Sequence, residues 1–133
     1  LVANQAKIQK IEVFVDLPQE LIIINGIASL LQQVFMNLFL NAINAMVDGG
    51  SLRVWMVRKE SHVSVGVADT GEGISEADIG KIFDPFYTTS PVGRGTGLGL
   101  SLCYSIIKHH FGSIEVTSRK GEGSTLTVIL PAN

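Results

Sequence analysis

The sequence predicts a two-layer α/β sandwich, in which helices cover one face of a mixed, mostly antiparallel sheet. Three observations predict this fold class. Strand-like apolar segments outnumber helix-length segments, most of them are paired across short turns as in hairpins, and two long segments carry apolar residues at helical spacing. The length of 133 residues fits a single domain, so we expect one domain over residues 1–133.

The first half of the chain predicts two strands, a helix and a hairpin. One strand is expected where apolar residues alternate, and another where a short β-branched run lies between Pro18 and Gly26. A helix follows because apolar residues recur every three or four positions from Leu31 to Met46, and Gly49 and Gly50 end it. The predicted elements are strands over Ile8–Val15 and Leu21–Ile24, a helix over Ser29–Met46, and strands over Leu52–Val57 and Val63–Val67.

The second half predicts a short helix, a long helix and a second hairpin. Ser75 is a candidate N-cap for the short helix, and Pro85 and Pro91 bracket a stretch without periodicity that we expect to be a mobile loop. Gly112 ends the long helix. The predicted elements are helices over Glu76–Phe83 and Gly97–Phe111 and strands over Ser113–Ser118 and Thr125–Leu130.

Composition excludes several classes of protein. With 46% hydrophobic and 17% charged residues, the chain does not resemble a disordered protein. A net charge of −2 gives no basis for binding a polyanion, so we expect no nucleic acid partner. No apolar run approaches the roughly 18 residues of a spanning helix, so we expect no membrane contact by this domain. The single cysteine, Cys103, excludes an intrachain disulfide and fits a reducing, cytoplasmic location.

Glycine is the compositional anomaly. Seven of the fourteen glycines lie between residues 71 and 99. A glycine inside a regular element costs roughly 0.5–1 kcal/mol relative to alanine. The cluster therefore indicates a flexible loop, turns with positive φ, or a backbone that a ligand approaches closely.

Three asparagines recur on the first long helix. Asn37, Asn41 and Asn44 are spaced at i, i+4 and i+7, which places their amides on one stripe. An amide oxygen is a ligand that magnesium accepts when phosphates and waters supply the other positions. Alternatively, the stripe faces water.

Asp69 stands where a buried-type strand ends, followed by Gly71 and Gly73. A carboxylate there can accept a hydrogen bond from an exocyclic amine, while glycines let a flat ring approach the backbone. Alternatively, Asp69 forms an Asx-turn. A calcium loop is a weaker alternative, because the two glycines occupy positions where such a loop needs oxygen ligands.

The densest glycine run, Gly93–Leu100, leads into the second long helix. Backbone N–H groups at a helix start can converge on an anion, so this run predicts a phosphate-binding site. Its spacing matches neither the P-loop nor the dinucleotide-binding fingerprint.

Taken in order, these features resemble the ATP-binding catalytic domain of sensor histidine kinases. That superfamily also contains gyrase-type, mismatch-repair and heat-shock chaperone ATPases. The resemblance covers nearly the whole chain and implies a Bergerat fold. It rests on the N box Gln33–Ala42, the first glycine box Asp69–Ile74, the F box Phe83–Thr89, the second glycine box Gly95–Leu100 and the last glycine box Gly121–Ser124.

The resemblance also implies roles for individual residues. Asp69 would accept the adenine amino group, and Asn41 would coordinate a magnesium ion that bridges the phosphates, with Asn37 close by. A lid would run from about Asp84 to Thr96, anchored by Phe83 and Phe86. The implied ATP site comprises Asn37, Asn41, Asp69, Gly71, Gly73, Ile74, Gly95, Thr96, Gly97, Leu98, Gly99, Leu100 and Ser124.

Two residues carry the expected catalytic roles. Arg94 is the candidate cation near the γ-phosphate, because Ser90 and Asn44 stand where relatives often have basic residues. Alternatively, Arg94 is a solvated arginine of the lid. In hydrolysing relatives a glutamate replaces Asn37 and acts as general base for water. The Asn37 amide cannot accept that proton, which favours phosphoryl transfer over hydrolysis.

The chain has no good candidate for the phosphoryl acceptor. His62 lies in a strand turn, and the helix dipole is sufficient to explain His109 and His110 at the end of the second long helix. The family's acceptor histidine lies on a separate helical dimerisation domain, which we expect N-terminal to Leu1 and absent from this fragment. The isolated fragment should therefore not phosphorylate itself.

The resemblance implies two-component signal transduction. The domain would bind Mg-ATP and donate the γ-phosphoryl group to that histidine, and a response regulator would then receive it. A cytoplasmic position of this domain is compatible both with a membrane-anchored parent protein and with a parent that has no anchor. The alternatives are an ATP-gated ATPase of the same superfamily, and an anti-sigma-factor-type serine kinase or pure interaction module.

Overall fold

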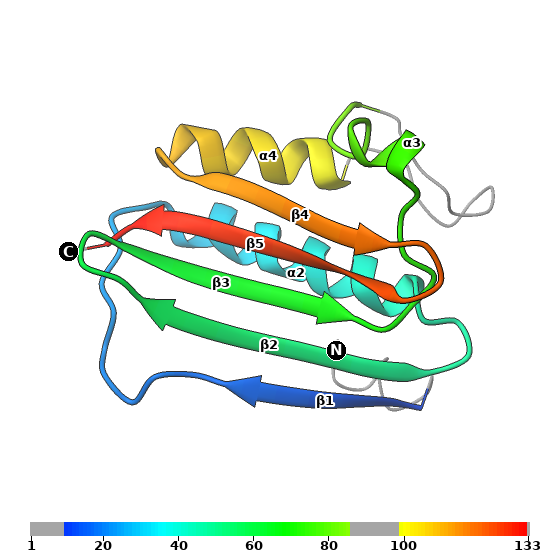
Figure 1. Cartoon of the computed structure of the whole chain (residues 1–133). Helices are drawn as coiled ribbons and strands as arrows, with labels where there is room; N and C mark the ends of the chain where they lie inside the picture. Colours follow the sequence, from blue (N-terminus) through cyan, green and yellow to red (C-terminus); the bar gives the residue numbers. More distant parts are fainter. Residues whose placement is uncertain (1–9, 86–98, 133) are drawn as a thin grey trace.

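The computed structural model describes residues 10–85 and 99–132, which form a five-stranded sheet with helices on one side (Figure 1). The predicted two-layer sandwich is confirmed. Its elements in chain order are β1 (Ile11–Asp16), α2 (Ala28–Asn44), β2 (Gly50–Arg58), β3 (His62–Asp69), α3 (Glu76–Ile79), α4 (Gly99–His109), β4 (Ser113–Arg119) and β5 (Gly123–Pro131).

The sheet is mixed and mostly antiparallel, as predicted. Its strand order is β1-β2-β3-β5-β4, with β1 parallel to β2 and the other neighbours antiparallel. The parallel pair arises because α2 lies between β1 and β2 and carries the chain back to the end from which β1 started (Figure 1). The register places Asp69 of β3 between Leu52 of β2 and Ser124 of β5.

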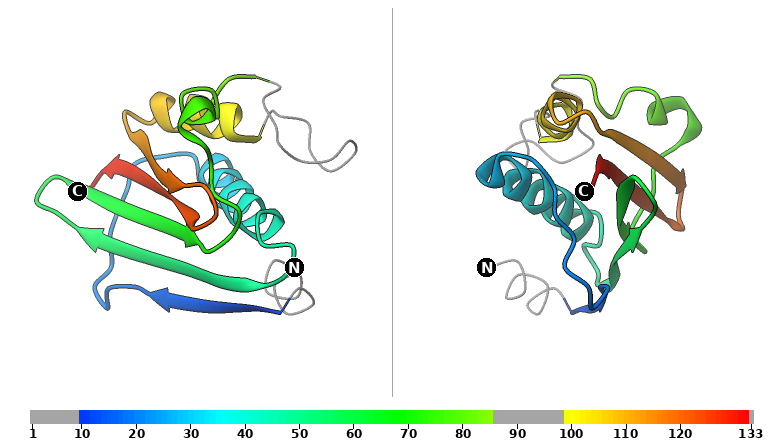
Figure 2. Two further views of the ribbon diagram at one scale, coloured as in Figure 1. Left: turned by 45° about the vertical axis from the view of Figure 1, so that its right-hand side comes forward. Right: turned by 90° about the vertical axis from the view of Figure 1, so that its left-hand side faces the viewer.

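The hydrophobic core lies between the sheet and the two long helices. Figure 2 shows α2 and α4 on the same side of the sheet. Val34, Leu38 and Ala42 recur every four residues on α2 and are at most 3% exposed, so one helical stripe is buried as its spacing predicts. Deleting a side chain such as Leu38 from this layer would cost about 2–5 kcal/mol.

The segment Leu21–Ile24, predicted as a strand, is not one. It leads from the end of β1 across the end of the sheet to α2, so no strand runs alongside to pair with it (Figure 1). Burial nevertheless alternates along this apolar run, since Ile22 and Ile24 contact the core while Leu21 and Ile23 are exposed.

Element ends differ from prediction by a few residues. The short helix stops at Ile79 rather than Phe83 and continues as turns. Ser75 occupies its N-cap, but its hydroxyl donates to Asp78 Oδ2 at 3.0 Å instead of accepting from a backbone N–H. The loop expected between Pro85 and Pro91 lies mostly outside the described residues. Within residues 10–85 and 99–132, no helix is long and apolar enough to cross a membrane.

Candidate functional site

Asp69 is a buried carboxylate at the end of β3. Its side chain is 8% exposed; Oδ1 accepts the Gly71 N–H at 2.9 Å and Oδ2 accepts the Ser124 hydroxyl at 3.2 Å. Burial raises the pKa of Asp69 above its ordinary value, although these hydrogen bonds lower it in part, and the charge of Glu72 adds to the rise. No lysine or arginine within residues 10–85 and 99–132 forms a salt bridge with Asp69.

A buried carboxylate that forms no salt bridge with the described residues destabilises the folded state, so its presence points to a function. The bond from Gly71 N–H is the Asx-turn that the sequence left open as an alternative. This turn does not use all of the carboxylate's lone pairs, because two oxygens together can accept about four hydrogen bonds. Asp69 therefore keeps acceptor capacity for a ligand.

The loop after Asp69 is tied to two other parts of the chain. Glu72 N–H donates to Ala45 O at 3.1 Å, which joins the loop to the residue after α2, and Glu72 O accepts Gly121 N–H at 2.7 Å from the β4–β5 turn. Ser118 adds a third link: its hydroxyl accepts Ile74 N–H at 2.7 Å and donates to Gly123 O at 2.9 Å. These contacts hold the loop in one shape.

Gly71 and Gly73 are required by protein contacts. A Cβ on Gly71 would collide with the carbonyl group of Ala45. Gly73 has φ +71°, and a Cβ there would collide with the carbonyl group of Arg119. Both positions therefore demand glycine whether or not a ring approaches them.

The predicted asparagines differ in environment along α2. Asn37 and Asn41 are half-buried, whereas Asn44 is exposed. The alternative that the stripe faces water thus holds for Asn44, while the first two asparagines lie partly inside the molecule.

Only part of the second glycine box falls within the described residues. Arg94, Gly95, Thr96, Gly97 and Leu98 lie outside them, as does Phe86. Gly99 and Leu100 form the first turn of α4, and no described atom lies within 4 Å of the place where a Cβ of Gly99 would be. Unlike Gly71 and Gly73, Gly99 is not required by any contact within the described residues.

An open pocket of about 340 Å³ lies beside Asp69, between the end of β3 and the β4–β5 hairpin. The C-terminal end of α2 lies at the same end of the molecule (Figure 1). Asp69 and the last glycine box account for four of the pocket residues, and the flanking parts of the β4–β5 hairpin supply the other four. The lining residues are Asp69, Thr117, Ser118, Arg119, Glu122, Gly123, Ser124 and Thr125.

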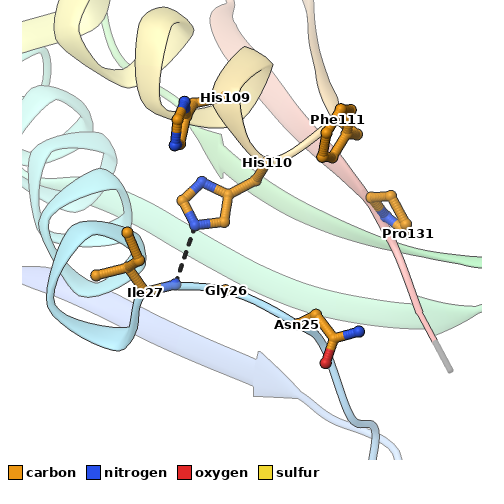
Figure 3. Close-up of a pocket in the computed structure, with 7 residues that line it drawn as sticks. All are labelled: Asn25, Gly26, Ile27, His109, His110, Phe111 and Pro131. Carbon is orange, nitrogen blue, oxygen red and sulfur yellow. Dashed lines mark hydrogen bonds between the residues drawn. The ribbon is translucent and has the colours of Figure 1, made fainter.

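A second pocket, of about 360 Å³, lies at the opposite end of β5 (Figure 3). Its buried histidine, His110, accepts Ile27 N–H at Nε2 at 3.1 Å, and its Nδ1 lies 2.8 Å from Ile106 O. An amide can only donate and a carbonyl can only accept, so these partners assign the neutral ring with its proton on Nδ1. The lining residues are Asn25, Gly26, Ile27, His109, His110, Phe111 and Pro131.

The explanation of His110 by the helix dipole is therefore incomplete. His110 is 7% exposed and joins the end of α4 to the start of α2, whereas His109 beside it is exposed. Sequence reasoning missed this contact, together with Ser118 and the carbonyl group of Ala45. Within residues 10–85 and 99–132, no cluster of three or more His, Cys, Asp or Glu side chains could hold a metal ion.

Comparison with known proteins places these observations in a family context. Residues 26–133 match the family described as Histidine kinase-, DNA gyrase B-, and HSP90-like ATPase. The chain is 38% identical over 131 residues to sporulation kinase A of Bacillus subtilis, covering 98% of this chain and 21% of that protein. It is 42% identical over 103 residues to the sensor histidine kinase ZraS of Escherichia coli, covering 77% and 22%.

Solved structures give the same result for the fold. A nucleotide-free catalytic domain of the histidine kinase ThkA superposes with a TM-score of 0.85 at 31% identity, covering 97% of this chain and 85% of that one. The chain spans about a fifth of the length of the two sequence relatives above.

Proposed function

We propose a function from one premise: the chain belongs to the Histidine kinase-, DNA gyrase B-, and HSP90-like ATPase family, and within it to the catalytic domains of sensor histidine kinases. On this premise the domain binds Mg-ATP and presents its γ-phosphoryl group to a histidine on a separate helical domain of the parent protein. A response regulator then receives the phosphoryl group.

The observation that carries the nucleotide proposal is the buried carboxylate of Asp69. Its oxygens are held by Gly71 N–H and the Ser124 hydroxyl, and an open pocket lies beside it. In the proposal, Asp69 accepts the exocyclic amine of adenine, Ser124 lies next to that contact, and Gly71, Gly73 and Ile74 border the base. A guanine, which presents a carbonyl oxygen at that position, would face the carboxylate with an acceptor and bind less well.

We assign the metal and phosphate contacts to the two helices. The carboxamide oxygen of Asn41 has the hard, neutral chemistry that Mg²⁺ accepts, and Asn37 lies one helical turn away. The described residues offer no acidic cluster that could bind the metal without phosphates, which suits an ion that arrives with the nucleotide. The ion would supply charge neutralisation, and N–H groups from Gly95 to Leu100 would hold the phosphates.

The side chains of Asn37 and Arg94 favour transfer of the γ-phosphoryl group over hydrolysis of ATP. Asn37 has no basic oxygen with which to accept a proton from water. Arg94 is proposed to neutralise charge near the γ-phosphate. An ATP-gated ATPase is disfavoured because it needs a base at residue 37. A serine kinase or interaction module is disfavoured because ZraS and ThkA, to which the chain is similar, are named as histidine kinases.

Nucleotide-dependent thermal stability tests the binding step. A ligand at 100 times its Kd should add about 2.7 kcal/mol to the free energy of unfolding, which for a domain of this size is a rise in Tm of roughly 10 °C. We expect this shift with Mg-ADP and Mg-ATP and a smaller one with Mg-GTP. No shift at millimolar Mg-ADP would refute the proposal.

Labelling with γ-phosphate-labelled ATP tests the transfer step. The full-length parent should acquire an acid-labile phosphohistidine, and residues 1–133 alone should stay unlabelled, because the proposed acceptor histidine lies on a separate domain. Label on a serine of the parent or of an added partner would instead favour the serine-kinase alternative.

A further inference from the structure

Ser118 is a half-buried serine near the end of β4, and the proposed function gives it no role. Its hydroxyl accepts Ile74 N–H at 2.7 Å and donates to Gly123 O at 2.9 Å. A hydroxyl has one proton to donate and two lone pairs with which to accept, so it can form both bonds at once. Ile74 ends the first glycine box and Gly123 belongs to the last one, so a single side chain joins the two boxes.

The strand register places Ser118 at the edge of the site. It pairs with Ser124 on β5, which in turn pairs with Asp69 on β3. Directly opposite residues project from the same face of a sheet, so the three side chains form one row across three strands. Because neighbouring strands lie about 4.8 Å apart, Ser118 is too far from Asp69 to bond its carboxylate. Ser118 therefore acts on the surroundings of the carboxylate and not on the carboxylate itself.

The rest of the loop after β3 has contacts of its own. Glu72 is bonded to Ala45 O and to the β4–β5 turn, and the two hydrogen bonds of the Asp69 carboxylate do not involve Ser118. Loss of the Ser118 hydroxyl should therefore leave both residues in place. It should free the backbone that follows them, Gly73–Ile74, because the bond from Ile74 N–H is the one that is lost.

The freed backbone is the part of the loop that the proposed function sets at the border of the base. A loop that is held in its bound conformation before the ligand arrives gives higher affinity than one that the ligand must order. We propose that Ser118 is a positioning residue, which holds Ile74 so that an adenine ring bordered by Gly73 and Ile74 meets the Asp69 carboxylate. This inference rests on the proposed function. Guanine presents an acceptor to Asp69, so the same alignment gives it no comparable gain.

Two substitutions separate hydrogen bonding from packing. Ser118→Thr and Ser118→Val introduce side chains of nearly the same shape, both favourable in a strand, and only threonine keeps the hydroxyl. Ser113→Ala, which removes a half-buried hydroxyl from the other end of β4, is the matched control.

The measurement is the ratio of the affinities for Mg-ADP and Mg-GDP, obtained by calorimetry with GDP in competition against ADP. We expect Ser118→Val to reduce this ratio roughly three- to tenfold, the size of one neutral hydrogen bond. Ser118→Thr and Ser113→Ala should stay within about twofold of wild type. A hydroxyl that serves only the stability of the fold would weaken both nucleotides equally, so an unchanged ratio in Ser118→Val would overturn the proposal.

A double substitution tests whether Ser118 acts through the alignment with Asp69. In an Asp69→Asn background the carboxylate that distinguishes the two bases is gone, so adding Ser118→Val should leave the ratio unchanged. A further fall of the ratio would show that Ser118 contacts the base independently of the carboxylate, and the positioning role would be wrong.

Amide hydrogen exchange, followed by NMR, adds a readout that needs no nucleotide. The Ile74 amide should exchange faster in Ser118→Val than in Ser118→Thr, while the Gly121 amide, which bonds Glu72 O, should stay protected in both. Equal exchange of Ile74 in the two variants, or loss of protection at Gly121 as well, would contradict a local positioning role. A wild-type protein that binds no ADP would overturn the proposed function itself, so the two failures are distinguishable.

Discussion

Replacing Asp69 by asparagine tests two effects of the buried charge separately: its cost to the stability of the fold and its contribution to nucleotide binding. The two side chains have nearly the same shape. Asn Oδ1 can still accept Gly71 N–H, and Asn Nδ2 can donate to the Ser124 hydroxyl, which is able to rotate from donor to acceptor. The variant should therefore fold with its local contacts preserved and without the buried charge.

The raised pKa of Asp69 sets the sign of the effect on stability. The folded state holds the proton up to a higher pH than the unfolded state, in which the carboxyl titrates near 3.8. The free energy of unfolding therefore falls as the pH rises from that value through the raised pKa of the folded state, and the deficit stays constant above it. At pH 7 the ligand-free Asp69→Asn protein should be at least as stable as wild type, and the difference should vanish below pH 4.

Nucleotide binding should change in the opposite direction. A hydrogen bond to a charged group contributes about 1.5–3 kcal/mol, so the loss of the carboxylate should weaken ADP binding roughly 10- to 150-fold, because asparagine can turn an NH₂ group toward the ring amine. Wild-type affinity should also fall as the pH is lowered through the raised pKa of Asp69, while Asp69→Asn shows no such fall.

Calorimetry with Mg-ADP and thermal melts of the ligand-free protein check both parts. Asp48→Asn, which removes an exposed carboxylate, is the matched control and should change neither quantity. Equal ADP affinity in wild type and Asp69→Asn would remove Asp69 from the adenine site. Weaker binding accompanied by a large fall in Tm would show that the residue acts through the fold.

Three further substitutions probe other parts of the molecule. Asn41→Ala should reduce the Mg²⁺ dependence of ATP binding, and an unaltered metal titration would exclude it as a ligand. His110→Ala removes the partner of the part-buried Ile27 N–H and should cost about 1–3 kcal/mol of stability without changing ADP affinity, whereas the exposed neighbour His109→Ala should have no effect on the melt. Ser118→Ala should also cost about 1–3 kcal/mol of stability, measured as a lower Tm, and it should weaken ADP binding. Ser118→Thr, which keeps the hydroxyl, should restore both the Tm and the affinity.

Local pattern was enough to predict the helices, the two hairpins and the layer arrangement. Apolar spacing on α2 reports directly on burial, as Val34 and Leu38 illustrate. Local pattern could not distinguish β1 from Leu21–Ile24, because neither alternating apolar residues nor a short β-branched run reveals whether a neighbouring strand is present to pair with the segment. Only the first of these segments runs alongside β2.

The contacts that shape the site were beyond local pattern because they join distant residues. Ile74 and Ser118 are 44 positions apart, and Ile27 and His110 are 83 apart. For Ser118 one signal was available. Counting outward from the β4–β5 turn pairs Ser118 with Ser124, which the motif already placed beside the carboxylate. For His110 no comparable signal exists, since the start of a helix does not reveal which histidine will accept its N–H.

The glycines show how far a sequence motif can be interpreted. The cluster left three explanations open, and the structure divides the glycines among them by what surrounds each one. Gly71 and Gly73 lie against carbonyl groups of Ala45 and Arg119, so the fold requires them even without a ligand. Gly99 meets no described atom, so only the proposed phosphate contact gives a reason for its small size. The first glycine box thus shapes the loop that holds the buried carboxylate. The proposed nucleotide site is therefore supported by that carboxylate and not by the glycines around it.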